Sequence, residues 1–178
     1  MSLFIPPSAI CYYHNHNVYA HQLADIDTHL RVTLFAVPIF VGFGSQAADR
    51  NTGYFNEIKR YIELNKTFCR RVMSNNPVVF HHTPDASVNN SAPWCVLEYA
   101  RQDQSCGYAG IFKLKNDMAD NEYLFKPRGI DISQSYNVTL DNDKQRLTIS
   151  GWELSQTGIK VRLDASKTSE LILYDVKK

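Results

Sequence analysis

The chain has 178 residues, a formal net charge of +1 and 44% hydrophobic residues, which is typical of a globular protein with one substantial core or two small ones. It has no basic excess that would indicate a nucleic-acid partner. The longest apolar run, residues 34–43, is interrupted by Pro38 and Gly42, so no membrane-spanning segment is expected.

Residues 9–13 form a short apolar run behind Pro6-Pro7, and this run predicts a strand that ends at His14. His14 and His16 are two residues apart, so they share one face of an extended chain, a spacing compatible with metal ligation. Because no third ligand follows at a defined spacing, a polar loop at the strand end is the preferred interpretation.

The next segment alternates between helical and extended patterns. Apolar residues at helical spacing predict a helix over residues 22–36, stopped by Pro38. The unbroken apolar run over residues 39–44 predicts a strand covered on both faces, with Ser45 in the loop after it. A second helix is expected over residues 54–73, with Asn51 or Thr52 as its cap. Strand, helix, strand, helix is the order of a βαβα unit.

At Asn76-Pro77 the periodicity changes from helical to extended, and we place a domain boundary there, between residues 1–76 and 77–178. Alternating apolar residues and turns predict strands at residues 78–81, 94–101, 107–115, 122–125, 136–140, 147–149, 159–163 and 171–174. Turns are expected at Asp141-Asn142-Asp143 and at Ser150-Gly151. Short strands at close intervals favour an antiparallel β-sandwich, so the predicted fold class is α+β.

Metal and cofactor motifs are not indicated. The four cysteines show no Cys-x-x-Cys spacing, so buried free thiols are expected. His81 and His82 are adjacent, so on a strand they point to opposite faces and cannot readily share one metal ion. We therefore expect core or surface histidines there, no bound metal and no other cofactor.

The order of motifs in the second half resembles the C-terminal β-sandwich of melibiase-type α-galactosidases, retaining glycoside hydrolases of families 27 and 36. The pattern is Tyr-x-Val, a short acidic turn, Ser-Gly-x-x-Leu and Gly-(Ile/Leu)-x-Val-x-Leu. The matching residues are Tyr136, Val138, Ser150, Gly151, Leu154, Gly158, Ile159, Val161 and Leu163.

The first half resembles the last two βα units of the (β/α)8 barrel that precedes this sandwich in the family. The matching residues are Arg31, Pro38, Ile39 and Gly42. An acidic residue often follows that strand in the family, whereas Gly44-Ser45-Gln46 stands here. The resemblance thus implies an antiparallel sandwich preceded by the end of a barrel.

A retaining glycosidase needs two carboxyl groups facing each other across the scissile bond. In the family that the chain resembles, both follow earlier barrel strands. The resemblance therefore implies a catalytically inert C-terminal fragment of a glycoside hydrolase, whose partners are the upstream barrel and a carbohydrate substrate. At the mouth of that barrel, His14, His16 and Ser45 would contact sugar hydroxyls. Trp152, after the Ser-Gly turn, is expected to be exposed and to stack on a sugar ring.

Two alternatives remain open. One is a carbohydrate-binding module, in which exposed Trp94, Trp152 and tyrosines would bind sugar without hydrolysis. The other is a structural interaction domain in which the first seventy or so residues form a helical cap on the sandwich.

Overall fold

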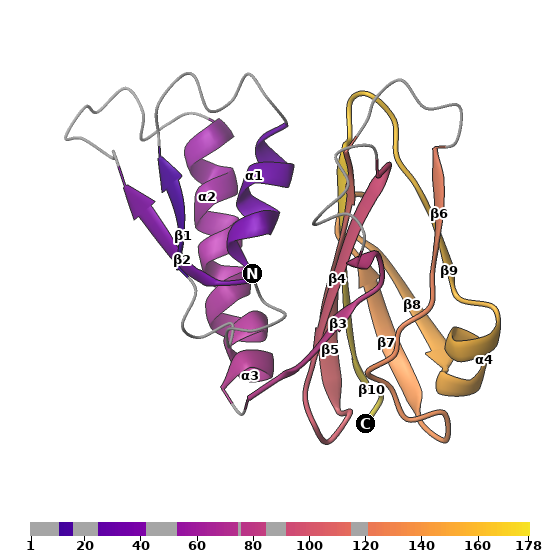
Figure 1. Ribbon diagram of the computed structural model, residues 1–178. Helices are drawn as coiled ribbons and strands as arrows, with labels where there is room; N and C mark the ends of the chain where they lie inside the picture. The colour runs from indigo at the N-terminus through magenta and orange to yellow at the C-terminus, as the bar shows by residue number, and fades with distance from the viewer. Residues whose placement is uncertain (1–10, 16–24, 42–52, 75, 85–91, 115–120) are drawn as a thin grey trace. The chain divides into compact units, whose positions relative to one another are not determined.

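The computed structural model describes residues 11–15, 25–41, 53–74, 76–84, 92–114 and 121–178. The chain divides into two compact units, Met1–Arg71 and Val72–Lys178, each described here by itself (Figure 1). None of the helices in the described ranges combines the length and the apolar character needed to cross a bilayer.

The first unit contains a parallel pair of strands joined through a helix. Strand β1 (Cys11–Asn15) pairs with β2 (Val37–Val41), and helix α1 (Ile26–Thr33) lies between them in sequence. A parallel pair needs such a crossover, because its strands run in the same direction. The register matches Cys11 with Val37 and Asn15 with Val41, so the two strands end level with each other.

Helix α1 is shorter than the predicted helix over residues 22–36. It begins after Asp25, whose side chain accepts a hydrogen bond from the Thr28 backbone N–H at 2.8 Å, an N-cap. It ends when the Leu34 backbone N–H bonds to the carbonyl of Arg31, which tightens the last turn. The prediction that Pro38 stops the helix is therefore wrong, because Pro38 lies inside β2. His14 likewise belongs to β1 rather than to a loop after it.

The predicted helix over residues 54–73 is confirmed in extent, but it has three parts. Helix α2 (Gly53–Leu64) continues into the π-helical turn η4 (Asn65–Cys69) and then into α3 (Arg70–Met73). Thr67 donates its hydroxyl to the Glu63 carbonyl at 2.7 Å, and a hydroxyl that bonds to the preceding turn competes with the regular helical hydrogen bonds. Asn51 and Thr52, the predicted caps, lie outside the described residues.

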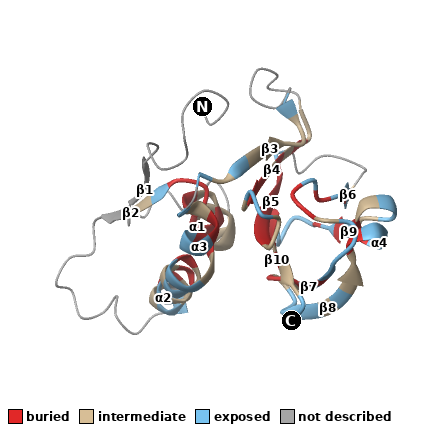
Figure 2. Cartoon of the chain, turned by 90° about the horizontal axis from the view of Figure 1, so that it is seen from below, coloured by how far each residue is buried: buried red, intermediate tan, exposed pale blue. Residues whose placement is uncertain are grey.

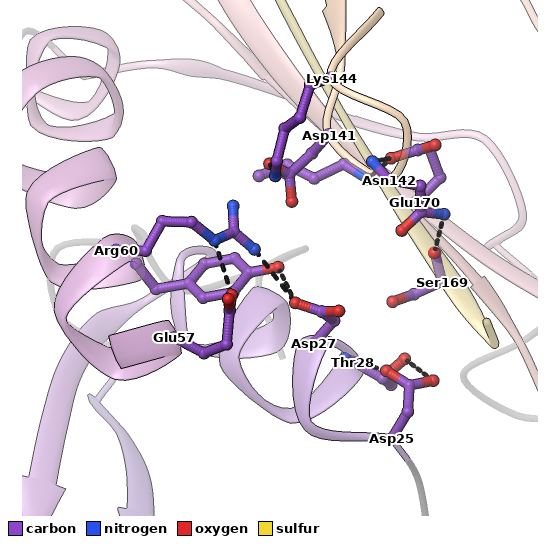
Figure 3. Close-up of polar contacts among 12 residues, drawn as sticks. Asp25, Asp27, Thr28, Glu57, Arg60, Asp141, Asn142, Lys144, Ser169 and Glu170 are labelled. Atoms are coloured by element: carbon purple, nitrogen blue, oxygen red, sulfur yellow. Dashed lines mark hydrogen bonds and ion pairs between the residues drawn. The ribbon is translucent and has the colours of Figure 1, made fainter. Parts of the chain in front are cut away.

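Helices α1 and α2 are joined by a polar contact (Figure 3). Asp27 of α1 accepts hydrogen bonds from Arg60 at 3.1 Å and from the Tyr61 hydroxyl at 2.8 Å. Arg60 also donates to Glu57 at 2.7 Å, one turn back on its own helix. The acidic first turn of α1 is therefore neutralised by α2.

The described part of the second unit contains eight strands, all of them paired antiparallel. They are β3 (Val78–His81), β4 (Trp94–Ala100), β5 (Cys106–Lys113), β6 (Glu122–Phe125), β7 (Ser135–Leu140), β8 (Gln145–Ser150), β9 (Ile159–Arg162) and β10 (Ser169–Val176). Six of them form one sheet in the order β3-β4-β5-β10-β7-β8, and β6 pairs with β9 in a second, small sheet. The predicted α+β class, dominated by antiparallel sheet, is confirmed.

The core of this unit lies between the two sheets, where Figure 2 shows the buried residues. Tyr136, Val138 and Leu140 of β7 are buried while Ser135 and Asn137 are exposed, as the alternation in the sequence predicts. The small sheet adds apolar residues from its own strands to the same cluster, namely Phe125, Ile159 and Val161.

The two predicted turns have different outcomes. Asp141-Asn142-Asp143 does turn the chain from β7 to β8, with Lys144 at a positive φ of 54° completing the turn. The Ser150-Gly151 turn was the wrong interpretation, because a short helix, α4 (Gly151–Gln156), begins there. Ser150 caps this helix by accepting a hydrogen bond from the Glu153 backbone N–H at 3.2 Å.

Three Asp-x-Ser turns shape the loops of this unit. In each, the Asp carboxylate accepts hydrogen bonds from the backbone N–H and the hydroxyl of the Ser two residues later, in the pairs Asp103 with Ser105, Asp131 with Ser133, and Asp164 with Ser166. These bonds favour the charged carboxylate. The pKa of each Asp is therefore lowered, chiefly by Arg101 at Asp103, by the Ser133 backbone N–H at Asp131 and by the Ser166 hydroxyl at Asp164.

A matched pair of substitutions on α4 tests how the short helix is anchored. Leu154 is 1% exposed and belongs to the core cluster, so Leu154→Ala should lower the free energy of unfolding by about 2–5 kcal/mol. Trp152, two residues earlier, is exposed, and Trp152→Ala should change it by less than about 0.5 kcal/mol. Urea denaturation followed by circular dichroism measures both values. Equal losses would mean that Leu154 does not anchor α4.

The Asp-x-Ser turns make stability depend on pH at the acidic end. Their carboxyl pKa values are lower in the folded chain than the unfolded value of about 3.9, so this stabilisation is present above pH 4 and is lost as the pH falls further. Asn keeps an acceptor oxygen but does not titrate. Replacing Asp103, Asp131 and Asp164 together by Asn should therefore reduce the drop in melting temperature between pH 5 and pH 2. The same drop in both proteins would contradict the assignment.

Candidate functional site

Of the four residues predicted to contact sugar, the structure describes the side chain of one, Trp152, and only the backbone of another, His14. His14 lies in β1, but its side chain is not described, and His16 and Ser45 lie outside the described residues. Trp152 lies on α4 and is 62% exposed, which confirms the expected exposure. Trp94 is 7% exposed and packs against the Tyr123 ring at 5.6 Å between centroids, so it is a core residue. The sugar contacts themselves stay a prediction.

The carboxylate of Glu98, in β4 of the second unit, is fully buried and yet bound by several donors. It accepts four hydrogen bonds from different parts of the unit. The donors are the Tyr174 hydroxyl at 2.6 Å, His82 Nε2 at 2.7 Å, and the backbone N–H groups of Arg128 and Gly129, each at 2.9 Å. We call these five residues the Glu98 cluster.

The cluster supplies the donors that a carboxylate needs away from water. Because the carboxylate accepts, we assign the Nε2 hydrogen to His82, whose ring also packs against Phe125 at 5.2 Å. Burial, together with the charge of Glu98, raises the pKa of Tyr174 well above its ordinary value. The Tyr174 hydroxyl therefore stays protonated at physiological pH and donates a hydrogen bond to Glu98.

Two glycines make room for the cluster. A side chain at Gly129 would bring its Cβ within 2.1 Å of Ala100 Cβ, and one at Gly107 would bring its Cβ within 2.2 Å of the Tyr174 hydroxyl oxygen. Real Cβ atoms do not approach other atoms so closely. Gly129 thus allows the loop between β6 and β7 to lie directly on β4, where its backbone donates to Glu98.

A second buried hydroxyl extends this network. Tyr136 donates its hydroxyl to the Gln104 carbonyl at 2.8 Å and accepts from the Asp131 backbone N–H at 2.7 Å. Its ring meets Tyr174 edge to face at 5.9 Å. Gln104 in turn donates its side-chain amide to the Ile130 carbonyl at 3.0 Å. The loop is therefore held to the sheet at several points.

The carboxylate of Glu98 is fully buried, and the four donors named above all belong to the second unit. Within the parts of the chain that the structure describes, no group of three His, Cys, Asp or Glu side chains is arranged to hold a metal ion. The His82 side chain is 6% exposed and hydrogen-bonds to the buried Glu98 carboxylate, so it has an interior position.

Sequence reasoning did not identify Glu98, although one signal was present. Glu98 lies an even number of residues from Trp94, Val96 and Ala100, so it is on the same face of the strand as these core residues. An acidic residue on the inward face of a strand indicates a buried carboxylate that requires donors. Its partners lie 16 to 76 residues away, and no local pattern identifies them.

The cluster predicts large effects of isosteric substitutions. Glu98→Gln keeps the shape but faces N–H donors with an amide group, so it should lower the free energy of unfolding by about 3 kcal/mol. Tyr174→Phe removes one hydrogen bond to a charged group and should lower it by about 2 kcal/mol. The control is Tyr123→Phe, since the Tyr123 hydroxyl has no hydrogen bond within the described residues, and its effect should stay below about 0.5 kcal/mol. Urea denaturation that ranks Tyr123→Phe with Tyr174→Phe would refute this role for Glu98.

No family model matches the chain. Among curated proteins, a galactokinase from Dictyostelium discoideum is 27% identical over an alignment of 111 positions, and the alignment covers 55% of this chain and 22% of that protein. The chain therefore spans less than a quarter of this relative, and the identity is low.

Solved structures give a much more extensive likeness. The α-galactosidase AgaB of Geobacillus stearothermophilus, from glycoside hydrolase family 36, matches 99% of this chain with a TM-score of 0.77 and 15% identity. The galactosidase domain of the α-galactosidase-sucrose kinase AgaSK matches 99% of it with a TM-score of 0.75 and 12% identity. An α-galactosidase from Lactobacillus brevis matches 97% with a TM-score of 0.72 and 15% identity.

In all three comparisons the chain covers 23% of the larger protein. Identities this low establish the fold alone. The resemblance to melibiase-type α-galactosidases that the sequence motifs indicate is confirmed, and the chain has the fold of about a quarter of a family 36 α-galactosidase.

Proposed function

We propose that this chain is the C-terminal part of a larger glycoside hydrolase acting on α-galactosides. Residues 77–178 form its non-catalytic sandwich, and residues 1–76 complete its catalytic barrel. The proteins to which the chain is similar are named as α-galactosidases and a galactokinase, which supports galactosides as the substrate class. Fold similarity on its own assigns no reaction. Two further observations support the proposal, namely the parallel strand pair of the first unit and the buried carboxylates of the second.

The observation that carries the proposal is the parallel pair β1 and β2. Parallel sheets are normally covered on both faces and contain more than two strands, because two strands alone bury too little apolar surface. Among the described residues, β1 pairs with β2 only. A barrel sheet in a longer chain would supply the neighbouring strands, and the 23% share of the similar enzymes leaves room for it.

The buried carboxylates of the second unit support a structural role. One of them is Glu98, which accepts four hydrogen bonds. Glu170 accepts hydrogen bonds from the backbone N–H groups of Asn142 and Leu171, both at 2.9 Å, and Asp141 accepts from Lys144 at 2.6 Å (Figure 3). Each carboxylate is buried and bound to groups of its own unit. A sandwich held together in this way would give a barrel a rigid support.

The positions of β1 and β2 also support a role for His14, His16 and Ser45. Active sites of barrel enzymes lie at the carboxyl ends of the parallel strands. Asn15 and Val41, which end β1 and β2, face each other in the register. In sequence, His16 directly follows one strand end and Ser45 follows the other by four residues. We therefore propose that these residues lie at the rim of the active site in the complete enzyme.

The length of the native polypeptide tests the proposal. The protein isolated from its source should have a mass far above the 20.4 kDa of this chain, and it should hydrolyse 4-nitrophenyl α-galactoside. Its upstream part should carry two carboxyl groups about 5–5.5 Å apart, the separation of a retaining enzyme. The 178-residue chain alone should show no hydrolysis.

Two outcomes would reject this function. A native mass equal to that of the 178-residue chain would exclude the upstream barrel. A longer native protein that leaves α-galactosides intact, but hydrolyses β-galactosides or phosphorylates galactose, would exclude the proposed reaction and retain only the fold.

A further inference from the structure

Trp152 is an exposed aromatic ring on a rigid support. It is 62% exposed, and neither an aromatic ring nor a cationic group of the described residues packs against it. A single exposed apolar residue is common on protein surfaces, so a binding surface has to be argued from what lies next to the ring.

The segment that carries Trp152 is fixed at both ends of its first turn. Ser150 caps α4, and Leu154 anchors it in the core. The Gly151 backbone N–H donates to the Gln134 carbonyl at 2.7 Å, which fastens α4 to the loop before β7. A binding surface that is already ordered loses little conformational entropy when a ligand arrives.

A second exposed apolar residue comes from that neighbouring loop. Ile132 is 59% exposed, and its Cα lies 3.0 Å from the position that a Gly151 Cβ would take. The backbones that carry Ile132 and Trp152 are therefore in contact, although the two residues are twenty positions apart in sequence. An exposed flat ring and an exposed aliphatic side chain thus come from adjoining segments.

Neutral amide groups accompany this apolar pair. Gln156 is exposed and lies four residues after Trp152, so both occupy one face of α4. Gln134, also exposed, is fastened to Gly151 through its backbone. A glutamine amide carries both donors and acceptors, as a sugar hydroxyl does.

We propose that Trp152, Ile132, Gln156 and Gln134 form a saccharide-binding surface. A hexopyranose presents an apolar C–H face that lies flat on an indole ring, while its hydroxyl groups bond to the two amides. A protein partner would bury about 800 Å² of this unit, far more than one ring and one aliphatic side chain offer, whereas a sugar ring matches their size. This surface does not depend on the reaction proposed above.

Fluorescence of the full 178-residue chain measures occupancy of this surface. The chain has two tryptophans, and Trp94 is buried, so acrylamide should quench mainly the emission of Trp152. Adding methyl α-galactoside should protect that emission from acrylamide. Retardation in a native gel that contains galactomannan gives an independent dissociation constant.

Single substitutions test whether saccharide binding depends on this surface. Trp152→Ala should weaken the retardation about tenfold, since one aromatic contact of this kind is worth about that factor. Gln156→Ala should weaken it a few-fold. The control is Leu114→Ala, which removes another apolar side chain that is 50% exposed. This change should leave the retardation unchanged.

The proposal is overturned if the unaltered chain shows neither protection nor retardation with either saccharide. It is also overturned if Trp152→Ala, shown to be folded by its denaturation curve, is retarded as strongly as the unaltered chain. Neither readout involves hydrolysis or native length, so this test and that of the proposed reaction can fail separately.

Discussion

The second unit depends on placing one negative charge where water cannot reach it. Moving a carboxylate out of water costs several kcal/mol, and Glu98 recovers that energy only when all four of its donors are in position. The donors come from β10, from the segment after β3 and from the loop before β7. A displacement of any one segment leaves a buried charge short of a hydrogen bond, so the cluster ties the positions of these segments to one another.

Local pattern determined much of this fold in advance. The alternation at Tyr136, Val138 and Leu140 predicted β7 and its inward face correctly, because burial on one side of a strand leaves a period of two. Helix α4 was missed although the Ser-x-x-Glu pattern at Ser150 signals a capped helix start. The π-helical turn at Asn65–Cys69 was missed because the apolar spacing of this segment is that of a regular helix. The Glu98 cluster requires contacts between distant segments, which periodicity does not encode.

Polar groups of each unit find partners within that unit, but the two units differ in their sheets. In the second, the buried carboxylates and the tyrosine hydroxyls find partners within the unit itself. In the first, Asp27 neutralises charges between α1 and α2, while the described sheet consists of a single parallel pair. The described part of the first unit therefore has much less sheet than the second, which contains a six-stranded and a two-stranded sheet.

The position of β10 has a consequence for how the chain acquires its structure. This strand comes last in the sequence, yet it lies in the middle of the large sheet, between β5 and β7. Until it is present, β3-β4-β5 and β7-β8 are separate hairpin assemblies with exposed inner edges. On a ribosome, the two assemblies can therefore join only after β10 has been made. The Tyr174 hydrogen bond to Glu98 spans 76 residues. Closure of such distant contacts is slow, so these edges are the sites at which a nascent chain needs protection from aggregation.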